Sequence, residues 1–541
     1  MKSETKITSG TAEISAVLHS GPSDHPDNGS TEAERIPTTG EAPGVLSSSV
    51  LVLVASVFGC GLNYLFGIYL ARWLGAADFG LYAIGLGIFN ILILLAPLGL
   101  DTTIMKYVSQ SLGLGETHRI RPYILLAGII TLLCGVLFGI CLGASSGWLA
   151  EKIFNKPELT RVLVIFAIGI PAAAVSAVLL SSLRALHDIR QYVSIKYFLE
   201  PAGKFALTAV VVWFGWGLAS VLGGILVILT VSTIVTILCL FRMTDYRSGH
   251  YYSEWALSVP AFLAFSYPLV VSNLFGILAP RSDVLFIGAW FTSRDVGVYS
   301  AASQTAAILG LIMTAFHSAV IPMIGTVIAR KDQARLESLF RFTSRWTLAL
   351  SLLIFIYFVL FGREILHLFG EGFAKGAPWL IILAAGHLVN SASGPATATL
   401  IMAGHPRIIM VNSIVMGLLL IGANMLLIPW YGALGAAWSM ALHVSAGSVL
   451  CIVEARWLCG VTPFSRSMAK PLWAGAAALT AGGFVKSELP PAYTAAVGLL
   501  VPAIFAAVLL AMKLDAADRQ ALLELAQKFR PLSRWLPDPS S

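Results

Sequence analysis

Stretches of about 20 apolar residues follow one another along most of the chain, with short polar segments between them. A helix needs about 20 mostly apolar residues to cross a bilayer. The stretches do not alternate apolar with polar residues, as the strands of a membrane barrel would. The pattern therefore predicts an all-α integral membrane protein with about 14 transmembrane helices. The predicted spans are 48–72, 80–104, 121–143, 160–182, 191–214, 217–240, 262–291, 297–325, 343–362, 378–401, 409–429, 433–455, 471–487 and 493–512.

Composition supports this interpretation. Hydrophobic residues make up 57% of the chain and charged residues only 12%, whereas a soluble domain carries about 25% charged residues. The net charge of +7 does not come from one basic patch, so no nucleic-acid partner is expected. Lys and Arg instead gather in the loops on the side of the N-terminal segment, which predicts that both termini are cytoplasmic. The six cysteines lie in or beside apolar stretches without metal-ligand spacing, so neither a metal site nor a disulfide framework is expected.

A motif of the first half returns in the second half. Residues 73–83 and 290–300 share the pattern Trp-x-x-x-x-Asp-x-Gly-x-Tyr at an offset of 217 positions, and Trp213-Phe214-Gly215 matches Trp430-Tyr431-Gly432 at the same offset. The repeat contains six predicted spans, an even number, so the two halves have the same orientation in the membrane. The Gly and Tyr residues of the motif are interpreted as structural, for tight packing and for anchoring at the interface.

These features predict the organisation of the chain. The predicted segments are a disordered cytoplasmic tail at 1–45, an N-terminal six-helix lobe at 46–243, a C-terminal six-helix lobe at 259–460, two additional transmembrane helices at 468–514 and a cytoplasmic amphipathic tail at 515–541. Two parallel lobes can hold a substrate site between them and expose it to either side in turn by rocking. The arrangement therefore favours a transporter.

The motif segments resemble a known family. The segment 71–82, Ala-Arg-Trp-Leu-Gly-Ala-Ala-Asp-Phe-Gly-Leu-Tyr, resembles the turn after the first span in polysaccharide transporters, the oligosaccharide-lipid flippase branch of the multidrug/oligosaccharidyl-lipid/polysaccharide exporter superfamily. Segments 297–302, 368–370, 402–407 and 431–437 extend the resemblance over about residues 46–460.

The resemblance implies a V-shaped arrangement of two lobes in the bacterial cytoplasmic membrane. It also implies a substrate, an undecaprenyl-pyrophosphate-linked oligosaccharide such as an exopolysaccharide, capsule or O-antigen repeat unit. The protein would move this lipid from the inner to the outer leaflet. Its partners would be that lipid-linked oligosaccharide, membrane lipids, and a glycan polymerase with export machinery.

Charged residues inside predicted spans are the candidates for function, because a charge at the bilayer centre costs at least about 2.5–3.5 kcal/mol on insertion scales. Arg281 is the first candidate, since a guanidinium matches phosphate oxygens with a planar fork of donors. Its alternative role is pairing with Asp283 or a neighbouring helix. Lys196, Glu200 and Lys204 form a stripe at positions i, i+4 and i+8. Lys204 either lines a cationic vestibule or is neutralised by Glu200, whose order in the sequence favours a pair.

The acidic residues Asp101, Glu200 and Asp283 are candidates for coupling or gating. Asp101 lies near the end of the second span, where the alternative is a charge placed at the interface. His317, His387 and His443 lie inside spans and are interpreted as helix contacts.

Two other functions are weighed against the flippase. A cation-coupled multidrug exporter of the same superfamily would need an acidic binding site, whereas acids inside the spans are few. A membrane glycan polymerase or ligase would need a large external loop with acid/base residues, whereas the predicted external loops are short. No catalytic constellation, phosphate-binding loop or cofactor motif is found, so the chain is not expected to be an enzyme or to hydrolyse nucleotides.

Overall fold

The computed structural model describes residues 42–186, 188–243, 262, 266, 280–488 and 494–512. The chain divides into two compact units, Met1–Ser47 and Ser48–Ser541. Residues 42–45, expected at the end of a disordered tail, are already helical and begin α1 (Ala42–Leu95). The rest of that tail, the predicted amphipathic segment from 515 and most of the seventh span lie outside the described residues. Every regular element in the described part is a helix.

The first helix bundle of the second unit is built around α4 (Leu159–Ala185), which packs on α2, α3 and α7. Small residues permit this packing, because a Cβ added at Gly139 of α3 would lie 2.7 Å from the carbonyl oxygen of Ala167. The other elements of this bundle are the second part of α1, α2 (Leu100–Gly113), α3 (Thr117–Trp148), η1 (Leu149–Ile153), α5 (Ile189–Val193), η2 (Ser194–Leu199), α6 (Glu200–Trp213) and α7 (Leu218–Met243).

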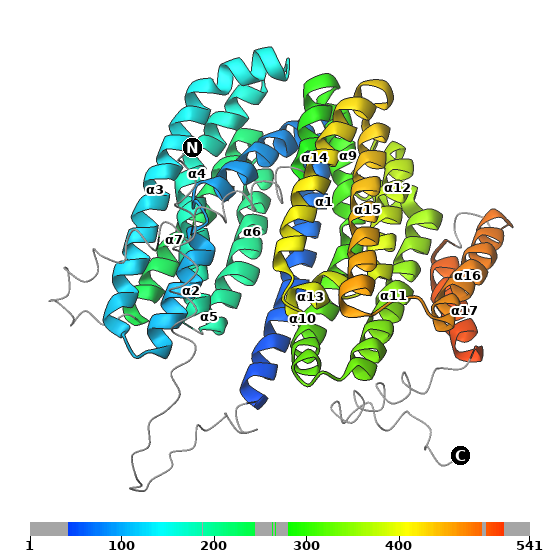
Figure 1. Ribbon diagram of the computed structural model, residues 1–541. Coiled ribbons are helices and arrows are strands. Elements are labelled where there is room, and N and C mark those ends of the chain that lie inside the picture. The colour runs from blue at the N-terminus through cyan, green and yellow to red at the C-terminus, as the bar shows by residue number, and fades with distance from the viewer. Residues whose placement is uncertain are drawn as a thin grey trace, which may run out of the picture. The chain divides into compact units, whose positions relative to one another are not determined.

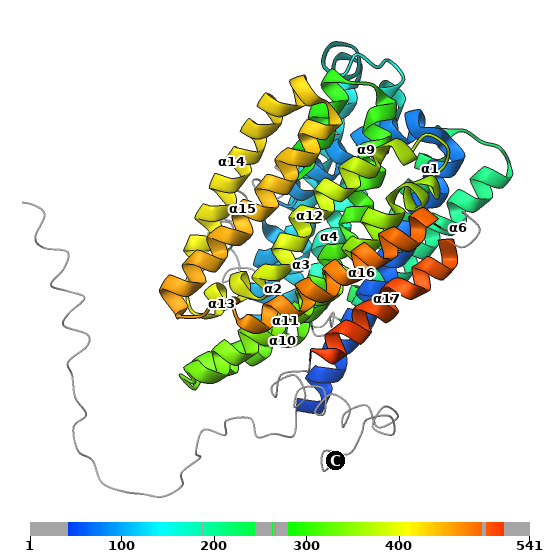
Figure 2. The same ribbon diagram turned by 90° about the vertical axis from the view of Figure 1, so that its right-hand side faces the viewer.

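The second bundle is built around α12 (Ala377–Ser393), which packs on α9, α11 and α15. Its other elements are a helix that includes residues 280–290, α9 (Ser293–Ala306), α10 (Ile308–Ala329), α11 (Gln333–His367), η3 (Ala374–Gly376), α13 (Ala396–Met402), α14 (Pro406–Tyr431) and α15 (Ala433–Cys459). After the short turn η4 (Arg466–Met468), α16 (Ala469–Glu488) and α17 (Thr494–Ala511) pair with each other, and α16 lies along α11. Figure 2 shows this pair beside the second bundle.

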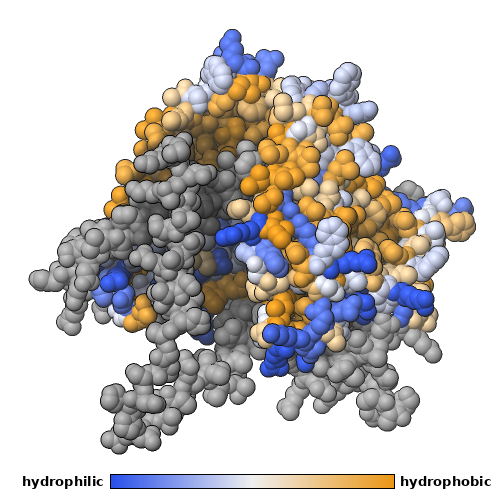
Figure 3. Space-filling view, viewed as in Figure 1, coloured by the Kyte–Doolittle hydropathy of each residue, from blue (hydrophilic) through white to orange (hydrophobic). Residues whose placement is uncertain are grey.

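The surface of the bundles suits a lipid environment. Eight helical segments of the described residues are long and apolar enough to cross a membrane, judged by length and composition. Large apolar side chains such as Leu426, 70% exposed, and Ile140, 65% exposed, stand on the outer helix faces. Figure 3 shows hydrophobic residues over much of the face in view. Exposed apolar area of this extent marks a membrane or protein interface, in agreement with the predicted all-helical membrane fold.

Helix α1 is longer than the predicted first span and contains a sharp break. Gly75 has φ 75° and ψ 172°, a conformation open to glycine because it has no Cβ. After this kink the helix continues to Leu95, and a second break follows at Leu98 and Gly99, with φ of 51° and 76°. The predicted span 80–104 therefore consists of the end of α1, this break and the beginning of α2. Sequence hydrophobicity does not show the break, because Leu98 is itself apolar.

The buried apolar residues show where the two bundles join. We call the end of the second unit that carries the Gly75 kink, at the top in Figure 1, the kink end. Near that end one core cluster contains residues of both bundles, among them Phe79, Phe166 and Tyr299. Toward the opposite end there are two smaller cores: one includes Ile104 and Leu183 of the first bundle together with Phe262 of the predicted seventh span, and the other includes Ile324 and Leu400 of the second bundle. Among the described residues, the large core that the two bundles share therefore lies at the kink end.

Candidate functional site: a cationic cavity between the two bundles

Two helices cross in backbone contact at the kink end. A Cβ added at Gly80 of α1 would lie 1.7 Å from the carbonyl oxygen of Ser293, and one added at Gly297 of α9 would lie 2.0 Å from that of Ala76. Both distances are far shorter than a van der Waals contact, so only glycine fits at either position. Close helix approach through such small residues is common inside membranes.

The connecting loops strengthen this contact. Lys156, in the connection before α4, donates from Nζ to the carbonyl oxygens of Gly288 (2.5 Å) and Phe291 (2.8 Å) in the second bundle. These carbonyls lie at the C-terminal end of the 280–290 helix, where backbone oxygens lack helical partners and favour a cation. Burial lowers the pKa of the Lys156 ammonium. Sequence reasoning missed Lys156, because nothing in a loop lysine indicates a buried position.

Aromatic side chains from the second bundle also contact α1. Phe369 and Phe373, between α11 and η3, pack edge-on against Tyr64 and Phe79 of α1, with ring centroids 5.7 and 6.1 Å apart. Tyr64 also shares a 3.1 Å hydrogen bond with Thr305 of α9. Each bundle therefore has one connection that contacts the other bundle. The connection from the first bundle contributes Lys156, and the connection from the second contributes Phe369 and Phe373.

Below this crossing lies a cavity of about 560 Å³ lined by both bundles. Phe79, Tyr82 and Ser300 line it near the crossing. Its charged lining residues are Lys196, Glu200 and Lys204 of the first bundle and Arg281 of the second. Arg281 and Lys204 lie about ten residues before the kink-end termini of their helices, which is about 15 Å along each axis. Three of the predicted site residues, Glu200, Lys204 and Arg281, thus line one cavity.

Of the three charged residues of the first bundle, Lys196 lies in the π-helical turn η2, and Glu200 and Lys204 lie in α6, which follows it. Glu200 is 4% exposed. It forms a 3.0 Å ion pair with Lys196 and accepts a 3.1 Å hydrogen bond from Ser232 Oγ of α7. The expected Glu200–Lys204 pair is not the one formed, because the carboxylate turns toward Lys196 and Ser232. Lys204 is left as a half-buried cation in the cavity wall.

The other predicted acids do not line the cavity. Asp283 is 2% exposed and accepts a 2.6 Å hydrogen bond from Tyr299 Oη and a 2.7 Å bond from the Val284 amide. These bonds hold it behind the wall that Val284 forms. Asp101 lies in the first turn of α2, outside the cavity lining. His317 and His443 contact the backbone oxygens of Gly394 and Met416, which fits their interpretation as helix contacts.

Uncharged polar residues complete the lining and were not singled out from the sequence. Asn63, Asn90, Ser303 and Gln304 add amide and hydroxyl groups. The buried Oγ atoms of Ser176 and Ser300 have no hydrogen-bond partner within the described part of the chain. Buried hydroxyls need a partner, so these atoms are available to water or a polar ligand. Scattered Ser and Asn residues in apolar helices give no periodic signal, which is why the sequence did not identify them.

The fold and the cavity define a class of protein: a helical membrane transporter with a polar chamber between two bundles, rather than an enzyme. The model of the family described as "Polysaccharide biosynthesis protein" matches residues 45–327, more than half of the chain, and that of MatE matches residues 268–426. The chain belongs to the polysaccharide biosynthesis protein family, within the superfamily that the sequence motifs indicated.

Individual relatives agree with this assignment. The probable low-salt glycan biosynthesis flippase Agl15 of Haloferax volcanii is 26% identical over 416 residues, which are 74% of this chain and 82% of the relative. Among solved structures, an inward-facing MATE-family multidrug resistance transporter has a TM-score of 0.65 at 14% identity, covering 76% of this chain and 97% of its own. The lipid II flippase MurJ in an inward closed conformation has a TM-score of 0.64 at 13% identity, and the match covers 85% of this chain and 98% of MurJ. At these identities the structures establish the shared fold.

Proposed function

We propose that this protein is a flippase for an undecaprenyl-pyrophosphate-linked oligosaccharide. The observation that carries the proposal is the cavity between the bundles: among the described residues that line it, Lys196, Lys204 and Arg281 outnumber the single acid Glu200. A diphosphate headgroup is an anion with many acceptor oxygens, which suits a guanidinium fork and an ammonium. The glycan flippase name of the Haloferax relative and the lipid II flippase name of the structural neighbour support this choice.

In the proposed topology the chain crosses the cytoplasmic membrane of a bacterium 14 times, about as many as the apolar stretches predict. Both termini are cytoplasmic, and the kink end faces outward. The lobes at 46–243 and 259–460 are parallel six-helix repeats, and 468–514 adds two helices. The crossing supports the repeat, since Gly80 and Gly297 are equivalent in the repeated motif and so are their facing residues, Ala76 and Ser293.

The proposed mechanism is alternating access. With the kink end closed by the crossing and by Lys156, the cavity takes the diphosphate and first sugars from the inner leaflet, while the lipid tail stays in the bilayer. Arg281 and Lys204 bind the diphosphate from opposite bundles. Rocking of the bundles then breaks the kink-end contacts and exposes the headgroup outside. A glycan polymerase and export machinery would consume the lipid there.

The acids have different proposed roles. Glu200 contacts Lys196 in the cavity and Ser232 of α7, so it is placed to couple headgroup binding to movement of the first bundle. Asp283 lies two residues after Arg281 and is fixed by Tyr299 of α9, so its role is to hold the 280–290 helix against α9 as the bundles move. Asp101 remains a proposed gating residue at the start of α2.

A multidrug exporter of cations fits this cavity less well. A cationic drug would meet three basic side chains and one carboxylate already paired with Lys196. The sidedness of the lipid-linked oligosaccharide tests the two functions. Cells depleted of the protein should accumulate that lipid on the inner leaflet. If the lipid reaches the outer leaflet normally while resistance to cationic drugs falls, the flippase proposal is wrong and the exporter replaces it.

A further inference from the structure

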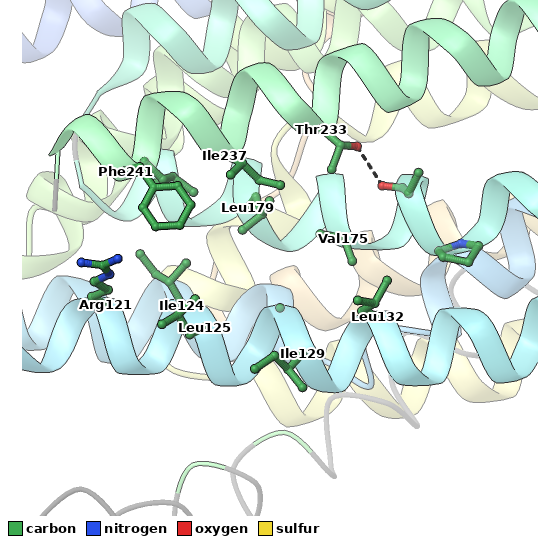
Figure 4. A pocket seen from close by; sticks show the side chains of 14 residues that line it. Arg121, Ile124, Leu125, Ile129, Leu132, Val175, Leu179, Thr233, Ile237 and Phe241 are labelled. Carbon is green, nitrogen blue, oxygen red and sulfur yellow. Dashed lines mark hydrogen bonds between the residues drawn. The ribbon is translucent and has the colours of Figure 1, made fainter. Parts of the chain in front are cut away.

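A second hollow lies in the first bundle, on the other side of α4. It is an apolar groove of about 320 Å³ between α3, α4 and α7, shown from close by in Figure 4. Side chains of α3 such as Ile129, 55% exposed, and Leu125, 46% exposed, form one wall. Gly128 widens the groove, because a Cβ added there would meet no atom within 4 Å.

The groove wall is mostly apolar and therefore suits a hydrocarbon chain. Its hydroxyl group, that of Thr233, donates to the carbonyl oxygens of Ala172 (3.0 Å) and Leu229 (2.8 Å); Figure 4 shows the bond that links α7 to α4. With that hydrogen bonding satisfied inside the protein, the wall offers little to a polar ligand. A volume of 320 Å³ has room for about ten groups of the size of a water molecule, at about 30 Å³ each, and a methylene group is of similar size.

One end of the groove is cationic. Arg121 lies above the Phe241 ring, 5.1 Å from its centroid, and Arg242 follows in the last turn of α7. From Arg121 to Leu132 the groove follows α3 for about 16 Å. That length is close to half of the bilayer's hydrocarbon core of about 30 Å, so the groove has the length of an acyl chain in one leaflet.

We propose that this groove is a binding site for one acyl chain of an anionic phospholipid, with the lipid phosphate at Arg121. The occupant is a resident lipid rather than the transported one. Within the described part of the chain no residue lines both the groove and the cavity: α4 turns Ala172 and Val175 to the groove and Ala173 and Ser176 to the cavity. An undecaprenyl tail is also several times longer than the groove. The proposal stands whether or not the flippase function is correct.

Native mass spectrometry of the purified full-length protein tests the site. The protein is titrated with phosphatidylglycerol or phosphatidylcholine of identical acyl chains, and retained lipid is counted. We expect one phosphatidylglycerol to be retained in preference to phosphatidylcholine. Arg121→Gln should lower that preference about fivefold, the effect of removing one basic residue near an anionic lipid surface. Gly128→Phe, which fills the groove, should lower retention of both lipids.

Two matched control variants distinguish lipid binding in the groove from the general effects of losing one positive charge or adding one aromatic ring. Arg456→Gln removes one exposed charge in the last turn of α15, in the other bundle. Gly147→Phe adds the same ring to α3 where a Cβ also meets no neighbour, outside the groove. Both should retain lipid as the unmodified protein does. The proposal is overturned if Arg456→Gln matches Arg121→Gln, if Gly128→Phe retains lipid normally, or if undecaprenyl phosphate displaces phosphatidylglycerol at equal concentration.

Discussion

Gly80 and Gly297 lie against each other where α1 and α9 cross, and the relation is symmetric. Ser293, four residues before Gly297, faces Gly80 with its carbonyl oxygen, and Ala76, four residues before Gly80, faces Gly297 in the same way. The contact is therefore made by equivalent parts of the repeated sequence motif. In the proposed mechanism this crossing must separate each time the cavity opens outward.

Alanine at Gly80 or Gly297 should weaken the closed kink end. The added Cβ meets a backbone oxygen that cannot turn away, so the helices must move apart, at a cost of about 1–3 kcal/mol as for other overpacked sites. Spin labels at the exposed positions Glu151 of η1 and Glu371 of the turn before η3, in a chain whose native cysteines are replaced, would report a longer distance across the kink end. Gly61→Ala is the control, because it lies on the same helix with no atom within 4 Å of the new Cβ. Unchanged distances in both crossing variants would contradict the prediction.

Lys156→Met should also open the kink end. The substitution keeps most of the apolar stem but removes the donor that reaches Gly288 and Phe291. Hydrogen bonds from a charged group contribute about 1.5–3 kcal/mol, so the open form should gain about 10-fold or more in population. The same pair of spin labels measures this change. Lys152→Met, an exposed lysine one turn earlier, should leave the distance distribution unchanged.

The closed kink end should become more stable as pH rises in the alkaline range. Burial lowers the pKa of Lys156 in the closed form, whereas in an open, hydrated form we expect the ordinary value of about 10.4. Between these two values the open form binds more protons, so raising the pH favours the closed form. Below the lowered pKa both forms are protonated and pH has no effect through this group. The shift should be absent in Lys156→Met; if it persists there, another group causes it.

Arg281→Gln should weaken binding of the lipid-linked oligosaccharide about 10- to 100-fold, as expected for the loss of a charge-assisted contact of about 1.5–3 kcal/mol. Arg281→Lys should restore part of this loss, because an ammonium keeps the charge but not the planar fork. The affinity of each purified variant for an undecaprenyl-pyrophosphate-linked sugar measures this loss. Arg363→Gln, an exposed arginine in the last turns of α11, is the control. Equal affinity in Arg281→Gln and the unmodified protein would remove Arg281 from the proposed site.

The sequence predicted the membrane fold and singled out charged residues that line the candidate site, and both have a clear physical reason. Long apolar stretches mark helices without reference to their neighbours, and a charge inside such a stretch is conspicuous, as for Arg281 and Lys204. Which side chains or backbone groups the charged residues contact was not predictable in the same way. Glu200 pairs with Lys196 rather than Lys204 and also accepts a hydrogen bond from Ser232 of α7, and Lys156 is buried by residues of the other bundle. Both depend on tertiary geometry that no local pattern contains.

Glu200→Gln should slow transfer of the lipid-linked oligosaccharide across the membrane without weakening its binding. The amide keeps the side-chain shape and can still accept the hydrogen bond from Ser232, but the substitution removes the one acid found among the described residues of the cavity lining. The cavity then becomes more cationic, so the lipid-linked oligosaccharide should bind as tightly as before or more tightly. If Glu200 couples the headgroup to the first bundle, transfer across reconstituted vesicles should slow despite this retained affinity. Ser232→Ala, which removes the other partner, should slow transfer in the same direction. Weaker binding in Glu200→Gln would instead show that the carboxylate contributes to substrate recognition, and normal transfer in both variants would remove Glu200 from the proposed coupling.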